Sequence, residues 1–488
     1  GSPAIYINGR KVNDLQELSQ LNSGDIKNVE VITNPGASYA ADVKSVIRIR
    51  TKPPKGDGFS GILRSDNGFQ HYFRTGNSLD LKYRTGGLEI FANYGWWRGN
   101  TRFNRLNDMN TTTSKGTYRQ FVSTIGKESY NDMTGKLGFS YMINDRHSIG
   151  AYYQNSWNRH NTDGTIPSEI WQNGILLDLY NSDVHNQSTA VPRHYANIYY
   201  NGIVGKLNID FNADYIWYKS RELTFNNELS EMGNDREVNS SSINRNRMFA
   251  EKLVMTYPLW KGQIEIGEEY TNTRTTNLFS ANIPETPNAD NRVDENNIAV
   301  FAELGQQFGR FMIGAGLRYE HVKFNYYEMG LLRDGQSKTY NNIFPSLNIA
   351  TEVGKVRMGL NYTGKTIRPG YDQLDGAISY INRLTYETGN PYLKPTKLQT
   401  VEYMAQWRRF FAQLSYTYFK DGVYHITEPY GPDGEATIIR TANLNHRHYL
   451  QAFVGGNFQV GVWQPKVNVG MMKQWLSLPV NGEQVNMN

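Results

Sequence analysis

Two histidines stand two positions apart in His446-Arg447-His448. Side chains alternate between the two faces of a β-strand, so both imidazoles would lie on one face if this segment is a strand. A pair of imidazoles on one face is a start for a metal site. The sequence shows no third or fourth ligand and contains no cysteine, so we predict no metal centre and no cofactor.

Motifs for catalysis are also missing from the sequence. There is no glycine-rich phosphate loop ahead of a helix, no His-Glu-x-x-His and no nucleophile elbow. Without cysteine there is no thiol nucleophile and no disulfide. Aspartate and serine are plentiful in polar stretches, but their positions assemble no convincing catalytic set. We predict no catalytic residues and a protein that is not an enzyme.

An aromatic pair beside a cation occurs in Trp96-Trp97-Arg98, at the end of a stretch that alternates like a strand. These side chains could contact a ligand, or they could belong to an aromatic girdle at a membrane interface. We favour the girdle, because interfacial tryptophan is expected in any membrane barrel. Trp97 and Arg98 remain candidates for ligand binding.

The elements that must position these residues are strands. Mean hydropathy is -0.61 and no stretch approaches the ~20 apolar residues of a membrane helix, which excludes a helical membrane protein. The chain has 33 tyrosines, 9 tryptophans and 45 glycines, a composition that favours a membrane β-barrel. Its formal net charge of +5 is spread over 488 residues, which is too dilute to predict binding to nucleic acid.

From about Phe59 onward, apolar and polar residues alternate with the period of a strand. In one such segment the apolar set is Leu207, Phe211, Tyr215 and Trp217, interleaved with Asn208, Asp210, Asn212 and Asp214. We predict that the apolar set faces lipid and that the polar set faces the lumen of a barrel, so outer-membrane lipid is one partner.

Short and long connections alternate between these segments. Tight turns are predicted near residues 85–87, 144–146, 205, 259–262, 308–310, 353–355, 407–410 and 461–465. Long polar connections are predicted at 98–132, 159–194, 219–247, 274–296, 324–342, 367–398 and 421–440. This pattern predicts an up-and-down barrel in the outer membrane, with short turns in the periplasm and long loops outside the cell. About 17 strands fit between 59 and 478. Since bacterial barrels use an even number, we expect further strands beyond Asn488 or a partner that closes the barrel.

Residues 1–56 have a different pattern and predict a small α+β unit. Residues 4–10 are expected to form a strand and then a turn, and further strands are expected at 29–32 and 46–50. Residues 14–21 have helical spacing. Asn34-Pro35-Gly36 is more simply an ordinary turn than a hinge. Residues 53–58, with two prolines and two glycines, predict a linker, which places the domain boundary between 1–56 and 57–488.

Several motifs resemble those of one family. Residues 25–39 (DIKNVEVITNPGASY) and 46–52 (VIRIRTK) resemble the end of the plug domain of TonB-dependent receptors. Further matches follow in order, at residues 342–347 (NIFPSL), 367–371 (IRPGY), 389–395 (GNPYLKP) and 402–403 (EY). The resemblance covers most of the chain. It implies a barrel of 22 strands around a plug, and it identifies residues 1–56 as the second half of that plug.

The resemblance also implies a function. Receptors of this kind import scarce or bulky substrates, such as metal chelates, haem or glycans, with energy from the inner-membrane TonB complex. Their ligands are held near the loop that precedes the GNPYLKP motif, which implies four further ligand candidates in this chain: Arg368, Tyr371, Arg383 and Tyr386. The alternative is a barrel that no longer transports and serves as a scaffold for a surface lipoprotein or other outer-membrane proteins.

One departure from the family concerns the attachment of the plug. Many of these receptors carry Arg-Gly-Pro where this chain has Thr33-Asn34-Pro35, and that arginine pairs with glutamates of the barrel. Glu320 and Glu402 stand at the glutamate positions and face the lumen by alternation. A buried carboxylate needs a cation. We therefore expect a replacement lock in which Arg48 or Arg50, with Arg10 as a further candidate, pairs with one of these glutamates.

Overall fold

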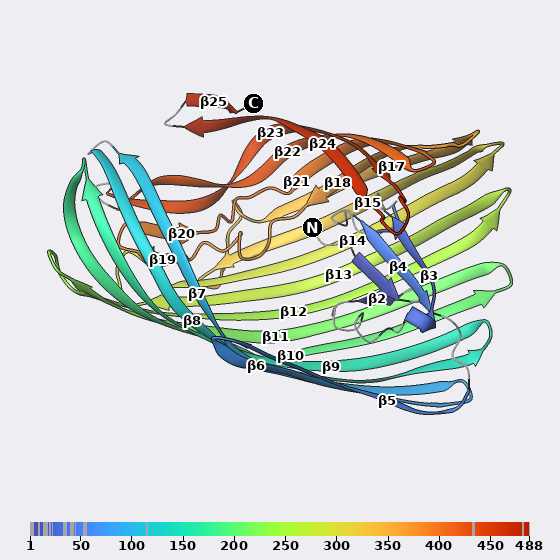
Figure 1. Cartoon of the computed structure of the whole chain (residues 1–488), viewed down its shortest axis with the longest axis horizontal. Helices are drawn as coiled ribbons and strands as arrows, with labels where there is room; N and C mark the ends of the chain where they lie inside the picture. Colours follow the sequence, from blue (N-terminus) through green and yellow to red (C-terminus); the bar gives the residue numbers. More distant parts are fainter. Residues whose placement is uncertain are drawn as a thin grey trace.

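The computed structural model describes residues 4–7, 10–12, 18, 21, 23–32, 37–39, 43, 45–51, 56–113, 116–431, 435–480 and 483–487. Within these residues, no helix combines the length and the apolar character that crossing a membrane requires. The architecture consists of a large barrel-shaped sheet and a small four-stranded sheet (Figure 1).

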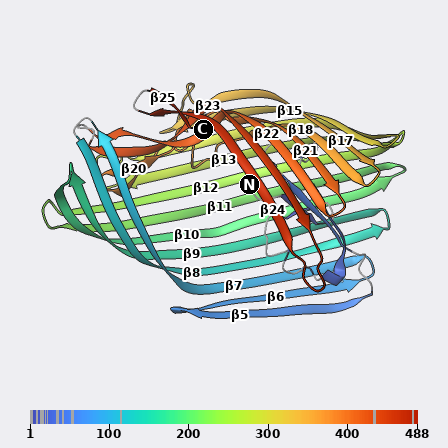
Figure 2. The ribbon, with the colours of Figure 1, turned by 45° about the horizontal axis from the view of Figure 1, so that its top comes forward.

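The barrel is formed by antiparallel strands that pair with their neighbours in sequence (Figures 1 and 2). Its long strands are β5 (Gly58–Gln70), β6 (Tyr72–Thr85), β7 (Leu88–Thr113), β8 (Gly116–Asn144), β9 (His147–Gln172), β10 (Ile175–Val204), β11 (Leu207–Ser230), β12 (Arg236–Leu259), β13 (Gly262–Ala281), β14 (Ala289–Phe308), β15 (Phe311–Glu328), β17 (Lys338–Val353), β18 (Val356–Ile367), β21 (Thr396–Trp407), β22 (Phe410–Tyr430), β23 (Ala436–Asn457) and β24 (Lys466–Val480). Shorter strands are β16 (Leu331–Leu332), β19 (Ile378–Asn382), β20 (Thr385–Thr388) and β25 (Glu483–Met487). Among the described residues, 17 strands contain twelve residues or more, which confirms the predicted number.

All eight predicted tight turns join consecutive long strands. Gly205 begins the two-residue turn between β10 and β11, and Gly354 begins the one between β17 and β18. Both glycines have a φ of 63°, the left-handed conformation that a two-residue hairpin turn requires. Glycine adopts it without the strain that a Cβ would add.

The long polar connections differ from the prediction. β7 continues to Thr113 and β8 resumes at Gly116, so most of the expected loop at 98–132 is an extended β-hairpin, and the same holds for the hairpins that follow. Beyond the membrane both faces of a hairpin meet water, so the apolar–polar alternation fades there. The backbone still needs hydrogen-bond partners and finds them in the adjacent strand. The connection between β18 and β21, in contrast, is largely irregular and carries the short strands β19 and β20.

The predicted orientation of β11 is confirmed by contacts. Asp214 accepts hydrogen bonds from Tyr195 at 2.5 Å and from the buried Asn197 at 2.6 Å. Asp210 lies within electrostatic reach of Arg48, which belongs to the small sheet, and therefore faces the lumen. On the opposite face Tyr215 is 41% exposed to the surroundings of the barrel.

The small sheet has the strand order β2-β1-β4-β3. Its elements are β1 (Ala4–Ile7), β2 (Arg10–Val12), the 3-10 turn η1 (Ser23–Asp25), β3 (Ile26–Ile32) and β4 (Val46–Thr51). Its core is a cluster of the apolar side chains Ile5, Ile7, Val12 and Ile49. Figures 1 and 2 place it toward the end of the barrel that carries the short turns. The expected helix at 14–21, the turn at 34–36 and the prolines of the linker fall mostly outside the described residues.

Candidate functional site

The connection between β18 and β21, residues 368–395, passes between two sides of the barrel. On one side β20 pairs in parallel with β23, from Thr385 opposite Thr437 to Thr388 opposite Arg440. On the other side the hairpin of β19 and β20 reaches the long hairpins of β10, β11 and β12. Figures 1 and 2 show β23 and these hairpins on opposite sides, with the connection between them. We call residues 368–395 the crossing loop.

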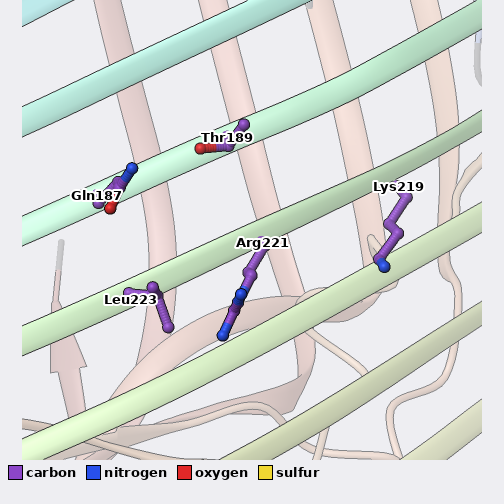
Figure 3. A pocket seen from close by; sticks show the side chains of 5 residues that line it. All are labelled: Gln187, Thr189, Lys219, Arg221 and Leu223. Atoms are coloured by element: carbon purple, nitrogen blue, oxygen red, sulfur yellow. The ribbon is translucent and has the colours of Figure 1, made fainter.

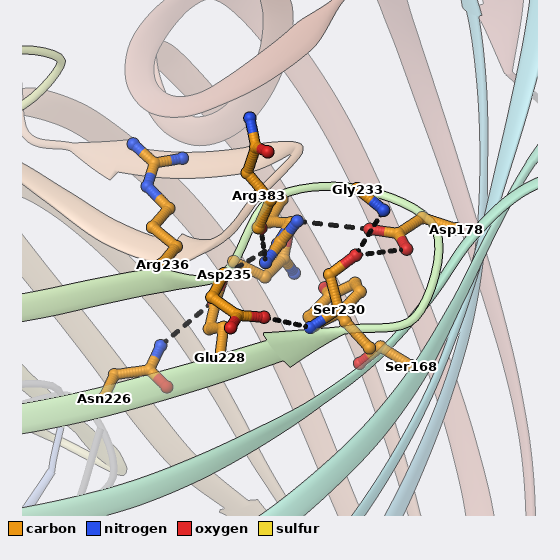
Figure 4. A network of polar contacts seen from close by, with 12 residues as sticks. Ser168, Asp178, Asn226, Glu228, Ser230, Gly233, Asp235, Arg236 and Arg383 are labelled. Carbon is orange, nitrogen blue, oxygen red and sulfur yellow. Dashed lines mark hydrogen bonds and ion pairs between the residues drawn. The ribbon is translucent and has the colours of Figure 1, made fainter.

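Arg383 holds the crossing loop to the wall (Figure 4). Its Nε donates to Glu228 Oε2 at 2.8 Å, and its Nη1 donates to Asp178 Oδ2 at 3.1 Å. Its Nη2 donates to the carbonyl oxygen of Asn234 at 2.9 Å. The side chain of Glu228 has no exposed surface, and those of Arg383 and Asp178 are 14% and 12% exposed. One guanidinium thus neutralises two buried carboxylates at the hairpin ends of β10 and β11.

Tyr380 adds a second contact from the crossing loop to the same carboxylate. Its hydroxyl donates to Glu228 Oε1 at 2.7 Å. Burial raises the pKa of Tyr380, and the negative charge of Glu228 raises that pKa further. The phenol therefore stays protonated and keeps its role as a donor. Both oxygens of Glu228 are bound by groups from the crossing loop.

The wall side of this network is also organised by hydrogen bonds. Ser230 Oγ donates to Asp178 Oδ1 at 2.6 Å, and the backbone N–H of Gly233 donates to Ser230 Oγ at 2.7 Å. Asp235 accepts from the backbone N–H of Ser230 at 2.9 Å. These bonds fix the tip of the β11–β12 hairpin around the position of Arg383 (Figure 4).

Both ends of the crossing loop pack on an apolar cluster. Leu374 and Leu393 are buried with Val293, Phe324 and Tyr326 of β14 and β15. Asp375, beside this cluster, accepts a hydrogen bond from Asn291 at 2.7 Å, and burial raises the pKa of its carboxyl group. The crossing loop is therefore held by apolar contacts near its two ends and by the ionic contacts of Arg383 in its middle.

A group of charged side chains lies in the lumen below the crossing loop. Arg318 donates to Glu320 at 2.7 Å and to Glu269 at 3.2 Å. Arg318 and Glu320 are each 1% exposed. Arg368, at the start of the crossing loop, also pairs with Glu320. This lumen charge cluster links the wall of the barrel to the loop above it.

The small sheet contacts the wall through lysines of the barrel. Lys252 donates to the carbonyl oxygen of Ser38, and Lys365 donates to the carbonyl oxygen of Val43. The ammonium group of Lys252 also lies 5.3 Å from the ring centre of Tyr39. Burial raises the pKa of Tyr39 to about 12, so this ring is neutral. Within the described residues, no group of three or more His, Cys, Asp or Glu side chains is arranged to hold a metal ion.

The geometry of the barrel agrees with a comparison to known families. A family model described as the outer membrane protein beta-barrel family matches residues 204–487, which is more than half of the chain. The chain belongs to that family. No curated protein matches it at a significant level.

Solved structures show the fold of this family member in more detail. The siderophore receptor PirA from Pseudomonas aeruginosa is 14% identical, with a TM-score of 0.55 over 97% of this chain and 79% of PirA. The hemophore receptor HasR of Serratia marcescens is 12% identical, with a TM-score of 0.57 over 98% of this chain and 75% of HasR. The copper transporter OprC is 10% identical, with a TM-score of 0.59 over 91% of this chain and 66% of OprC. The fold is that of TonB-dependent receptors, and the protein is an outer-membrane barrel.

Among the described side chains, neither Arg48 nor Arg50 forms the predicted lock with Glu320 or Glu402. Glu320 pairs with Arg318 and Arg368, which both belong to the barrel chain itself. Glu402 accepts from Gln413 at 3.1 Å, while Arg48 pairs with Glu30 inside the small sheet at 3.7 Å. For Arg48 and Arg50 the prediction was wrong. It did not consider Arg318, which stands two positions from Glu320 on the same face of β15 and pairs with Glu320.

The predicted lock named two further arginines. Among the described side chains, Arg50 is exposed and makes no ion pair with either glutamate. The side chain of Arg10 lies outside the described residues. The contacts of Lys252 and Lys365 with the small sheet were not predicted. Each lysine stands on a strand position that faces the lumen, where a buried cation needs an acceptor.

The ligand candidates have different surroundings. Trp97 lies beside Gly76 and Gly95 on the lumen face of β7, but Arg98, the next residue, points to the outside of the barrel. Arg98 is therefore not placed to bind a ligand in the lumen. Tyr386 is 2% exposed, and the guanidinium of Arg383 is paired with carboxylates. Both side chains therefore belong to the buried part of the crossing loop. Arg368 belongs to the lumen charge cluster through its pair with Glu320. Tyr371 packs against the apolar cluster of Leu374 and Leu393.

Proposed function

We propose that this protein is an outer-membrane receptor that binds and imports a scarce or bulky substrate, such as a metal chelate, haem or a glycan, in a TonB-dependent manner. The long hairpins lie outside the cell and the short turns lie in the periplasm. Residues 1–56 act as the second half of a plug, on which TonB pulls from the periplasm. Three solved proteins of the same fold are a siderophore receptor, a hemophore receptor and a copper transporter, which supports this class of function.

The observation that carries the proposal is the attachment of the crossing loop through Arg383. Its partners are carboxylates and a carbonyl oxygen, so the contacts can be exchanged for water or for a substrate without exposing an apolar core. In this closed arrangement the loop separates the mouth of the barrel from the lumen charge cluster. A substrate that competes for Arg383 would release the loop and reach Arg368 below it.

Uptake by cells tests the proposal. Cells that carry the full-length protein are given radiolabelled ferric siderophores, haem or oligosaccharides, with and without a protonophore. We expect one class of probe to accumulate only in energised cells, and Arg383→Ala to reduce that accumulation several-fold. The control Arg357→Ala removes an exposed arginine near a short turn and leaves uptake unchanged. Uptake that persists with the protonophore would contradict TonB dependence.

A non-transporting accessory barrel is the alternative, and one observation favours it. Among the described side chains, neither Glu320 nor Glu402 pairs with Arg48 or Arg50, so an ionic plug lock of the kind predicted is absent. Under this alternative the energised cells accumulate none of the probes. The protein then co-purifies from the outer membrane in a stoichiometric complex with a lipoprotein or another barrel.

A further inference from the structure

The imidazoles of His446 and His448 lie on the outer face of the barrel. In the ladder between β22 and β23, His448 is opposite Tyr418. Tyr416, two positions before Tyr418, is 40% exposed, whereas its neighbour Ser415 is buried. Exposed aromatic side chains of a membrane strand face outward, and residues two apart share a face. Both histidines therefore point away from the lumen.

The histidine pair stands where the outer face leaves the membrane. The outward positions of β22 from Phe410 to Tyr418 are apolar or aromatic, and they begin at a short turn. A membrane strand needs about 9–11 residues to cross the apolar part of a bilayer. The next outward residue is Lys420, which is opposite His446, and both side chains are exposed. Ions dissolved in water can therefore reach His446.

The two rings are close enough to share one metal ion. Their centres are 6.4 Å apart, and the ring planes meet at 69°. Two imidazoles that each bind one ion through a nitrogen at about 2.0–2.1 Å have centres roughly 5 Å apart at a tetrahedral angle. The remaining approach of about 1 Å needs only side-chain rotation, because the outer torsion of histidine is broad. His446 is exposed and free to make that rotation.

Tyr416 orients the ring of His448. The hydroxyl oxygen of Tyr416 lies 2.6 Å from Nδ1 of His448, and the ring centre of Tyr418 lies 5.1 Å from that of His448. In the tautomer whose Nδ1–H donates to Tyr416, the lone pair is on Nε2. A partner on the second ring nitrogen fixes the tautomer and the direction of metal-binding histidines. Nε2 of His448 is thus the nitrogen available to an ion.

The spacing of this pair sets it apart from the rest of the chain. In the whole sequence, His446 and His448 are the only histidines two positions apart. An outward-facing groove on β10 and β11 offers a different chemistry. It is lined by Gln187, Thr189, Lys219, Arg221 and Leu223 (Figure 3). None of these side chains is a preferred ligand of a transition metal ion, whereas imidazole is.

We propose that His446 and His448 bind one divalent transition-metal ion at the outer surface, with Cu²⁺ preferred over Zn²⁺. Imidazole suits both ions, and Cu²⁺ generally binds nitrogen ligands more tightly. The sequence shows no third protein ligand, so water completes the coordination of the ion. Lys420, opposite His446, carries its charge on a long exposed side chain that can turn to water. The site lies outside the lumen and does not depend on the proposed import function.

Metal binding by the full-length chain tests the proposal. The protein, without an affinity tag, is placed in nanodiscs and titrated with Cu²⁺, Zn²⁺ or Mg²⁺ in a calorimeter. Electron paramagnetic resonance of the Cu²⁺ form counts the nitrogen ligands. One double variant combines His446→Ala with His448→Ala. The control combines His321→Ala with His425→Ala, on β15 and β22. Both variants lose two histidines, so any difference between them reports position.

We expect one Cu²⁺ per chain with two nitrogen ligands, weaker binding of Zn²⁺ and no binding of Mg²⁺. The two-nitrogen signal disappears in the first double variant and is unchanged in the control. Tyr416→Phe keeps the two-nitrogen signal but binds Cu²⁺ roughly tenfold more weakly, because Nδ1 of His448 loses its partner. A two-nitrogen signal that survives without His446 and His448, or an equal loss in both double variants, would overturn the proposal. Wild-type affinity in Tyr416→Phe would overturn the positioning role of Tyr416.

Discussion

Arg383 shows how one side chain can hold a loop through contacts that remain exchangeable. The guanidinium is surrounded by Glu228, Asp178 and a carbonyl oxygen, and each contact is a hydrogen bond of 2.8 to 3.1 Å. Buried ions are costly to leave unpaired, but their contacts are specific in direction and can be replaced by other polar groups. An apolar anchor of equal strength would instead have to expose its surface to water.

Substituting Arg383→Ala should release the tip of the crossing loop. The change leaves the carboxylate of Glu228 buried without its cation, a loss that typically costs about 3–5 kcal/mol. Hydrogen exchange of the amides between 378 and 388 would measure the release. As a control, Arg440→Ala breaks the half-exposed pair with Glu428 and should cost about 1 kcal/mol or less. Equal protection in wild type and Arg383→Ala would contradict the anchoring role.

A second prediction concerns the lumen charge cluster. Arg318→Met should lower the free energy of unfolding strongly, because Glu269 then loses its ion pair with Arg318 and the buried Glu320 loses one of its two arginine partners. The double variant Arg318→Met with Glu320→Leu should be less damaging than Arg318→Met alone, since the main uncompensated charge is gone. Urea unfolding in a defined bilayer measures both. A double variant with the summed cost of its single changes would show that the two residues act independently.

At the scale of elements, the barrel wall depends on which face each strand turns to lipid. Leu317, six positions into β15, is 52% exposed on the outside, and Ile343 on β17 is 63% exposed nearer the far rim. Leu317→Arg should cost ~2–4 kcal/mol of unfolding free energy near the bilayer midplane, and Ile343→Arg only ~0–1 kcal/mol. Urea titration in bilayers would rank the two. Equal costs would mean that the membrane is not centred where the short turns place it.

The sequence predicted the strands of the wall well because one face of each meets lipid. Leu207 to Trp217 alternates cleanly, and the turn at Gly205 marks where the strand begins. The extension of β11 to Ser230 was not predicted, because Lys219 and Arg221 break the apolar period although the backbone stays paired.

The contact between Arg383 and Glu228 was also beyond prediction, since it joins residues 155 positions apart through an irregular loop. Lys252 could have been found from alternation, but its acceptor is a backbone carbonyl, which leaves no trace in the sequence.

At the scale of the whole molecule, the contacts described between the small sheet and the barrel are mainly polar. Lys252 and Lys365 each donate to one backbone carbonyl oxygen, and the apolar core of the small sheet is its own. The described strands before Gly58 pair only with one another and not with a strand of the barrel. A chain that begins at Gly58 should therefore still insert into bilayers, and planar-bilayer recordings should show a larger conductance than the longer chain. Failure to insert would show that the small sheet is needed for assembly.

In the proposed orientation the extended hairpins lie outside the cell, which has a further consequence for intact cells. A protease must pull several residues of its substrate out of any secondary structure before it can cut, and paired strands resist this far better than irregular loops. The hairpin of β7 and β8 carries Arg102, Arg105, Arg119 and Lys127, all exposed or half-exposed. Trypsin added to cells should nonetheless leave these sites uncut. Antibodies raised against short linear peptides from this hairpin should likewise fail to bind living cells, because the surface offered to the outside is a folded ribbon and not a flexible chain.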